Sequence, residues 1–160
     1  MIQLSFMDKA QKDKWLPLLF DLYYSNMSKI APSGLSYQEE RAEWFCAVSS
    51  ALDKELRKVI LCTERDEIIG YVQYYTRDDL LMIEEIQIAK KYHRTLLFYR
   101  ICKYLVTNLP SEIRYIEAYA DKRNANSQSI MRKLRMIQKD SDSKFVHLRG
   151  DAESVRKHLR

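Results

Sequence analysis

The order of strand-like and helix-like segments in the middle of the chain constrains the fold most strongly. Three segments rich in β-branched and aromatic residues follow one another at 58–64, 68–76 and 80–89, separated only by short polar turns. A helical pattern follows at 92–108, and another strand pattern at 113–120. Short turns favour antiparallel neighbours, whereas a strand–helix–strand unit makes its two strands parallel. The pattern therefore predicts a mixed α/β sheet with an antiparallel half and one parallel crossover.

Further elements flank this central unit. Ser36, followed by Glu39 three positions later, forms a capping box, which predicts a helix start after the break at 31–34. The other predicted elements are a strand at 2–6, helices at 9–30 and 126–134, and a strand at 145–149. We expect a single domain over 1–160, with about six to seven strands and four helices.

The charge and the cysteines bear on location and partners. Residues 89–105 carry five basic and no acidic side chains, and residues 122–139 carry six basic and no acidic ones. Such segments indicate either an anionic partner or two solvated helix faces. No apolar run approaches the roughly 20 residues of a membrane span, so no membrane partner is expected. Cys46, Cys62 and Cys102 are odd in number and widely spaced, which predicts buried, reduced thiols in a cytoplasmic protein.

Three stretches of sequence resemble the GNAT superfamily of acetyltransferases. They are "ERDEIIGYVQYY" (64–75), "IEEIQIAKKYHRTLLFYRICKYL" (83–105) and "NANSQSIMRKLRM" (124–136). The resemblance implies a GNAT-like fold and acetyl-CoA as co-substrate. It also implies transfer of an acetyl group to a primary amine of a small molecule or peptide.

The second stretch is similar to the segment that binds the cofactor in this family, but it contains no glycine. His93 stands at the family's Arg or Gln position, and Leu96 and Phe98 stand where small residues are usual. Independently of the family, the start of a helix leaves unpaired N–H groups that favour an anion. The alternative is a plain helix start whose apolar residues face the core. The cofactor contacts that the resemblance implies are Ile86, Gln87, Ile88, His93, Arg94, Thr95, Leu96, Leu97, Phe98, Asn124 and Ser127.

Asn124 and Ser127 match the family's second signature, in which such residues contact the pantetheine arm. They also suit a helix N-cap, and both roles remain open. Met131 stands where many members have a Tyr that protonates the leaving thiolate. The candidates to replace that Tyr are Tyr99, Tyr104, Tyr115 and Tyr119, or a water molecule.

Glu84 and Glu85 are the candidate catalytic residues. Alternation along a strand would place one beside Leu81 and Ile83, and the other beside Met82, Ile86 and Ile88. A carboxylate among apolar neighbours has a raised pKa, which suits a general base near neutral pH. Glu84 is the first choice by its spacing from the loop, and Glu85 is the second. The alternative is a pair of carboxylates in salt bridges at the rim of the sheet.

The sequence therefore predicts a cytoplasmic GNAT-type N-acetyltransferase that uses acetyl-CoA. It is compatible with either a monomer or a homodimer. The three histidines lack metal-ligand spacing, so no metal is expected. A second reading is a non-catalytic GNAT-like module that binds acyl-CoA or a protein partner. A third is a nucleic-acid binder that uses the two basic segments, although the acidic balance of the remaining chain counts against it.

Overall fold

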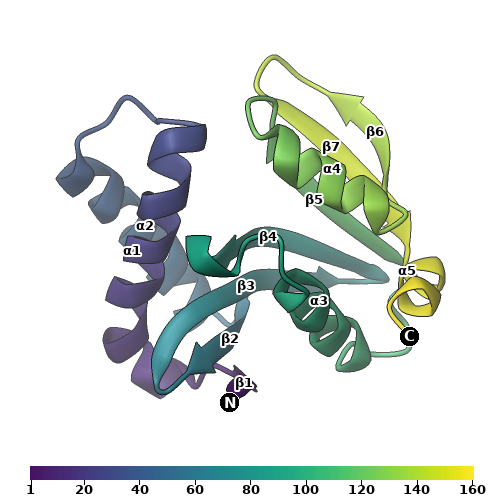
Figure 1. Ribbon diagram of the computed structural model, residues 1–160, viewed down its shortest axis with the longest axis horizontal. Coiled ribbons are helices and arrows are strands. Elements are labelled where there is room, and N and C mark those ends of the chain that lie inside the picture. The colour runs from purple at the N-terminus through teal and green to yellow at the C-terminus, as the bar shows by residue number, and fades with distance from the viewer.

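The computed structural model describes residues 1–160 and consists of one seven-stranded sheet with helices on both faces (Figure 1). The strands are β1 (Ile2–Phe6), β2 (Lys58–Glu64), β3 (Glu67–Arg77), β4 (Leu80–Ile88), β5 (Tyr115–Asp121), β6 (Ile137–Ser141) and β7 (Phe145–Asp151). The helices are α1 (Lys12–Ile30), α2 (Tyr37–Asp53), α3 (Leu97–Thr107), α4 (Ala125–Lys133) and α5 (Ala152–His158). Two short 3-10 turns, η1 (Lys9–Gln11) and η2 (Lys90–Tyr92), precede α1 and α3.

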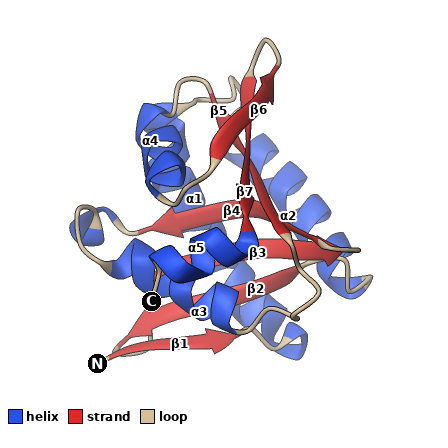
Figure 2. Ribbon diagram, turned by 90° about the vertical axis from the view of Figure 1, so that its right-hand side faces the viewer, coloured by secondary structure: helices blue, strands red, loops and turns tan.

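The sheet has the mixed topology that the sequence predicts. Its strand order is β1-β2-β3-β4-β5-β7-β6. Strands β1 to β4 are antiparallel neighbours, β4 and β5 are parallel, and β5, β7 and β6 are antiparallel again. Figure 2 shows that β5, β6 and β7 are turned steeply against β1–β4, so the sheet twists strongly at the β4–β5 junction.

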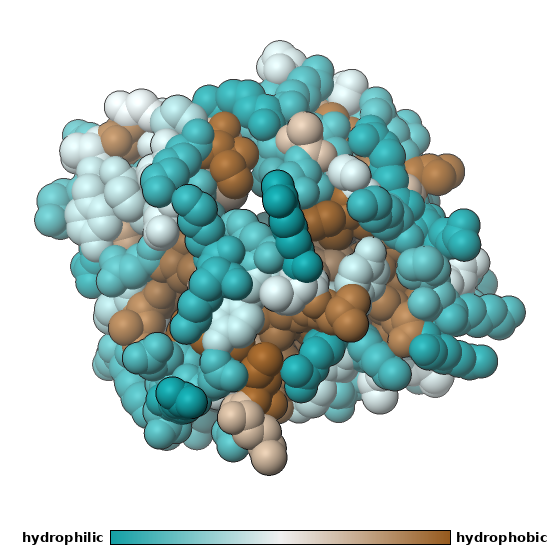
Figure 3. Space-filling model, in the orientation of Figure 1, coloured by the Kyte–Doolittle hydropathy of each residue, from teal (hydrophilic) through white to brown (hydrophobic).

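Each face of the sheet has its own apolar core. On one face, Trp15, Phe20 and Trp44 from α1 and α2 pack on Leu61 and Tyr71. On the other face, α3, α4 and α5 cover the sheet, with fully or nearly buried side chains from all three helices. In Figure 3, apolar side chains also reach the surface over the middle of the molecule, where α3 crosses β3 and β4.

Gly70 on β3 explains how α3 comes so close to the sheet. A Cβ atom at this position would lie 3.2 Å from the side chain of Ile101 and 3.1 Å from the carbonyl oxygen of Gln87. Because both contacts are tighter than ordinary van der Waals contact, a larger residue would push α3 away from the strands. A glycine at position 70 of β3 is thus required for the close packing of α3.

Several predicted elements need correction. The helix predicted at 92–108 begins only at Leu97, because Arg94 has a φ of 64° and interrupts the helical path. Strand β6 was not predicted, since all five of its residues are exposed and show no apolar alternation. The charged C-terminal segment forms α5, whose N-cap is Asp151.

The cysteines also differ from expectation in one case. Cys62 and Cys102 are buried, and burial raises the pKa of Cys62 to about 11 and that of Cys102 to about 12. Cys46, by contrast, is exposed on α2, so the expectation of three buried thiols is wrong for this residue. None of the helices combines the length and apolar composition that crossing a bilayer requires.

Candidate functional site

The candidate site lies where β4 separates from β5. Their pairing covers only Leu80–Ile83 against Tyr115–Ala118. Beyond it the two strands diverge (Figure 1), so β4 presents an edge without a strand partner from residue 84 to residue 88. Because the strands are parallel, their carboxyl ends lie on the same side, and each leads into a helix, α3 or α4. Two strand ends and two helix starts therefore border the opening between the backbones of the two diverging strands.

A β-bulge sits at the beginning of this free edge. Glu85 is opposite Gln73 and Ile83 is opposite Tyr74, which leaves Glu84 as the extra residue. The bulge shifts the alternation, so Leu81, Ile83, Ile86 and Ile88 all pack in the same core. The expected division of these apolar residues between two faces is therefore wrong. Arg57 lies near both carboxylates: its guanidinium is 3.9 Å from Glu84, and its charge lowers the pKa of Glu85.

Glu85 is a partly buried carboxylate held by two donors. The Tyr71 hydroxyl and the Trp44 indole Nε1, the latter at 3.3 Å, donate hydrogen bonds to it. Burial raises the pKa of Glu85 to about 7, although both hydrogen bonds act in the opposite direction. Burial and the adjacent Glu85 also raise the pKa of Tyr71, which keeps its hydroxyl protonated as a donor. The carboxylate can therefore change its protonation state near neutral pH.

Glu84 has a different environment. Glu84 is exposed, and its carboxylate pairs with the guanidinium of Arg57. This arrangement corresponds to the salt-bridged rim carboxylate that the sequence left as the alternative for this pair. The apolar surroundings expected of a general base belong to Glu85, the second choice of the sequence.

The loop between β4 and α3 supplies free backbone donors. The Nε2–H of His93 donates to the Ile88 carbonyl at 2.8 Å, which ties the loop to the strand end. Thr95 Oγ1 accepts from the Leu97 N–H at 3.2 Å. The N–H groups of Leu96, Phe98 and Tyr99 have no acceptor within the protein. The first turn of α3 thus offers several amides to an anion without any glycine.

The apolar residues of this loop differ in how far they are buried. Leu97 is buried in the core, Phe98 is partly buried, and Leu96 is 72% exposed. Arg94 is also exposed and has the left-handed backbone conformation noted above. The plain-helix alternative holds for Leu97, whereas Leu96 and Arg94 project outward beside the free amides.

On the β5 side of the opening, Asn124 caps α4. Its side-chain oxygen accepts a hydrogen bond from the Ser127 N–H at 3.1 Å, which confirms the N-cap role. The neighbouring Arg123 is paired with Asp121 through two contacts of 3.0 Å and also donates to the Pro32 carbonyl at 3.2 Å. These bonds connect the end of β5 with the α1–α2 loop.

Sequence reasoning missed several residues that shape the site. Asn26 of α1 donates to the side chain of Gln87 and to the carbonyl of Ile88, both at 3.0 Å, and so fixes the end of β4. Gln87 is buried, with its side-chain oxygen engaged by this bond. Tyr71 was also missed, and the hydrogen bond of Trp44 to Glu85 was not predicted. The one available signal was a polar Asn within the otherwise apolar stripe of α1.

The tyrosines considered as proton donors lie in different places. Met131 is buried in the core. Tyr104 packs on Phe6 with ring centroids 5.8 Å apart, and Tyr115 lies at the far end of β5. Tyr119 and Tyr99 border the opening: Tyr119 lies in the free part of β5, 53% exposed, and Tyr99 lies in the first turn of α3.

Comparison with known proteins places this geometry in a known fold. No protein-family model and no curated protein sequence matches the chain. Among solved structures, it is similar to PaiA N-acetyltransferase from Thermoplasma acidophilum in complex with coenzyme A, at 9% identity and a TM-score of 0.74 over 94% of this chain and 99% of that chain. It is also similar to a Desulfovibrio desulfuricans protein assigned to the GNAT family of acetyltransferases (12% identity, TM-score 0.75, 95% and 99% covered). A third is an acetyltransferase from Thermus thermophilus (13% identity, TM-score 0.74, 94% and 97% covered). The chain therefore has the GNAT acetyltransferase fold, as the sequence predicts.

Proposed function

We propose that this protein is an N-acetyltransferase that transfers an acetyl group from acetyl-CoA to a primary amine of a small molecule or peptide. The observation that carries the proposal is Glu85. Its carboxylate sits at the point where β4 leaves β5 in a GNAT fold, and burial raises its pKa to about 7. A base with this pKa can accept a proton from an ammonium group at neutral pH.

The cofactor would lie in the opening between β4 and β5. We place its pyrophosphate at the free amides of Leu96, Phe98 and Tyr99, where the dipole of α3 favours negative charge. His93, Arg94, Thr95 and Leu97 shape this loop. The amide groups of the pantetheine arm would pair with the free edge of β4 as an added strand does, along Ile86, Gln87 and Ile88. On the opposite side, Asn124 and Ser127 border the arm.

The reaction would be a direct transfer within a ternary complex. Glu85 takes a proton from the ammonium group, and the resulting amine nitrogen attacks the thioester carbonyl carbon. Collapse of the tetrahedral intermediate breaks the carbon–sulfur bond and releases the CoA thiolate. The nitrogen loses its second proton to water, and Tyr99, Tyr119 or water donates a proton to the sulfur. A tyrosine donor would regain its proton from solvent. Glu84 and Arg57 lie beside Glu85 and would face the acceptor rather than act as the base.

Replacement of Glu85 by glutamine tests this proposal. We expect Glu85→Gln to lower kcat by roughly 10²- to 10⁴-fold, because a general base contributes that much. The Kd for acetyl-CoA, measured by calorimetry, should stay unchanged. Rates would be measured with a panel of primary amines by following free CoA thiol. Glu84→Gln is the matched control, since it removes the adjacent carboxylate, which is paired with Arg57. A Glu85→Gln enzyme with the wild-type rate and pH profile would refute the assignment.

A non-catalytic acyl-CoA-binding or protein-interaction module is the second candidate. The exposed Leu96 and the partly buried Phe98 favour it, because they occupy positions where this fold commonly uses small residues beside the phosphate. Titration with CoA and desulfo-CoA, combined with the transfer assay, distinguishes the enzyme from the two kinds of non-catalytic module. Binding without transfer to any amine supports a module that binds acyl-CoA. Absence of binding at millimolar CoA supports a protein-interaction role.

A further inference from the structure

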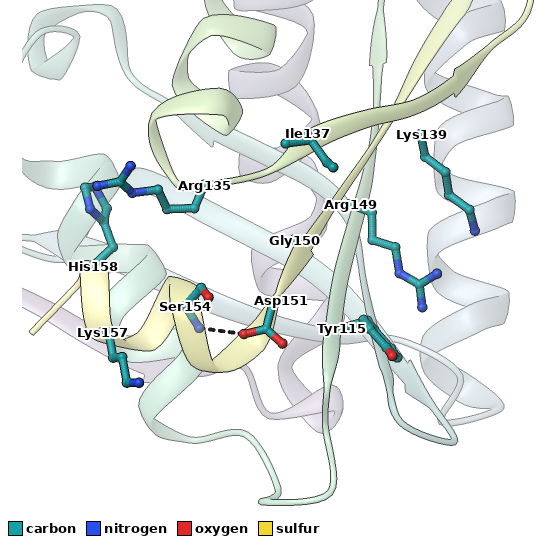
Figure 4. A pocket seen from close by; sticks show the side chains of 10 residues that line it. All are labelled: Tyr115, Arg135, Ile137, Lys139, Arg149, Gly150, Asp151, Ser154, Lys157 and His158. Atoms are coloured by element: carbon teal, nitrogen blue, oxygen red, sulfur yellow. Dashed lines mark hydrogen bonds between the residues drawn. The ribbon is translucent and has the colours of Figure 1, made fainter.

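A second cavity lined by polar side chains lies away from the residues of the candidate acetyl-transfer site. It has a volume of about 930 Å³ and is bordered by β6, β7, α5 and the turn after α4 (Figure 4). Small-molecule sites typically have volumes of about 300–1,000 Å³. Tyr115, at the start of β5, lines the cavity, whereas β4 leaves β5 after Ala118, further along that strand. Three residue steps of about 3.3 Å separate Tyr115 from Ala118 by about 10 Å.

The side chains around this cavity are strongly basic. Arg135, Lys139, Arg149 and Lys157 line it together with His158. The only carboxylate in the lining belongs to Asp151, and this group already accepts a hydrogen bond of 2.8 Å from the Ser154 N–H (Figure 4). The cavity therefore contains more positive charge than its own lining neutralises.

Carboxylates just outside the lining do not remove this excess. Lys157 pairs with Glu153 at 3.1 Å, but both side chains are more than half exposed, so the pair is weak. Buried Glu117 lies beneath the cavity, and His147 contacts it at 2.9 Å. Lys139 and Arg149 approach the same carboxylate only at 3.6 Å and 3.4 Å.

Arg149 is held in place by an aromatic ring and by its ion pair with Glu117, but its side chain makes no hydrogen bond within the protein. Its guanidinium lies 3.7 Å above the centroid of the Tyr115 ring. Its buried Nε–H has no hydrogen-bond partner. A guanidinium that is oriented by an aromatic ring and keeps free donors suits recognition of a phosphate or carboxylate.

Arg135 adds a backbone argument. It follows α4 with a φ of 72°, a left-handed conformation in which glycine is the usual residue after a helix. A side chain in this conformation costs about 1 kcal/mol. Arg135 makes no ion pair within the protein, and its side chain points toward His158 across the cavity in Figure 4. A strained cation without an internal partner indicates a role in binding.

We propose that this cavity binds a small molecule that carries several phosphate groups, at a site separate from that of acetyl-CoA. Several cations around a bounded hollow match a ligand with several negative charges close together. The volume fits a molecule of nucleotide size. An extended nucleic-acid strand would instead need a long basic track, whereas these cations border a single hollow.

Calorimetric titration with inorganic tripolyphosphate and with ATP, at 50 and 200 mM NaCl, tests the proposal. Arg135→Gly is the main variant, because glycine accepts the positive φ and the variant should fold at least as stably as the wild type. Arg94→Gly is the matched control: it also replaces an arginine of positive φ, but at the cofactor loop. We expect Arg135→Gly to weaken tripolyphosphate binding about tenfold, as for loss of one charge-assisted hydrogen bond. It should leave the Kd for CoA unchanged.

Three outcomes would overturn the proposal. Wild-type protein that releases no heat with either ligand has no such site. Tripolyphosphate binding that is lost in Arg94→Gly but kept in Arg135→Gly belongs to the start of α3. Binding of a single-stranded RNA 12-mer, with a steep salt dependence and no binding of tripolyphosphate or ATP, indicates a nucleic-acid surface instead.

Discussion

Among single side chains, Tyr71 most directly controls the candidate base. Its hydroxyl donates to Glu85 and so lowers the pKa of that carboxyl against the effect of burial. Tyr71→Phe removes this bond without changing the shape of the core. We therefore expect the acidic limb of the pH–rate profile to move to higher pH by about one to two units. Tyr74→Phe is the control, because Tyr74 is a buried tyrosine of the same strand without a bond to Glu85. A profile that does not move in Tyr71→Phe would show that another group is the base.

Among the helices, α4 depends on a single capping side chain. Asn124 accepts from the Ser127 N–H and so satisfies one of the N–H groups that the first turn of α4 leaves without an intrahelical partner. We expect Asn124→Ala to lower the free energy of unfolding by about 1 kcal/mol in urea denaturation, whereas Asn124→Ser should restore most of it.

Ser36→Ala provides a comparison on a helix remote from the cofactor loop. Ser36 caps α2 in the predicted capping box, with Glu39 bonding back to its N–H at 2.8 Å. Its loss should cost a similar amount of stability and leave CoA binding intact. If Asn124→Ala weakens CoA binding more than Ser36→Ala does, Asn124 contacts the cofactor as well as capping the helix. Equal stability of Asn124→Ala and wild type would contradict the capping role.

For the protein as one folding unit, Glu85 links stability to pH. Its pKa is raised from 4.5 to about 7 by burial, so the folded state keeps a proton that the unfolded state releases. The stabilising effect of this group is complete below about pH 4.5 and is lost as the pH rises through about 7. Relative to Glu85→Gln, the unfolding free energy of the wild type should therefore fall by up to about 3 kcal/mol between pH 4.5 and pH 7.5.

Urea denaturation of both proteins across this pH range measures the difference. Glu84→Gln controls for the loss of the neighbouring carboxylate, whose side chain is 32% exposed and lies beside Arg57. A difference between wild type and Glu85→Gln that stays constant with pH would mean that Glu85 ionises normally in the folded protein. That result would also remove the main support for Glu85 as the base.

Much of the architecture could be predicted from local pattern. Strands β1 and β2 match their predicted ranges of 2–6 and 58–64, and the capping box at Ser36 forms as expected. The parallel crossover followed from the strand–helix–strand order alone. These features could be predicted because periodicity, turns and caps act between residues that are close in the chain.

The site was less predictable because its chemistry depends on contacts between distant segments. The bulge at Glu84 is a property of the pairing between β3 and β4, and simple alternation along one strand cannot reveal it. Burial raises the pKa of Glu85, and hydrogen bonds from Trp44 and Tyr71, which lie 41 and 14 residues away, act against this rise. The sequence alone determined the order of the central elements, the antiparallel half and parallel crossover of the sheet, and the strand that carries the two carboxylates. Only the tertiary structure gave Glu84 and Glu85 different environments, because burial and long-range hydrogen bonds set the protonation of a carboxylate, whereas adjacent residues in the chain do not.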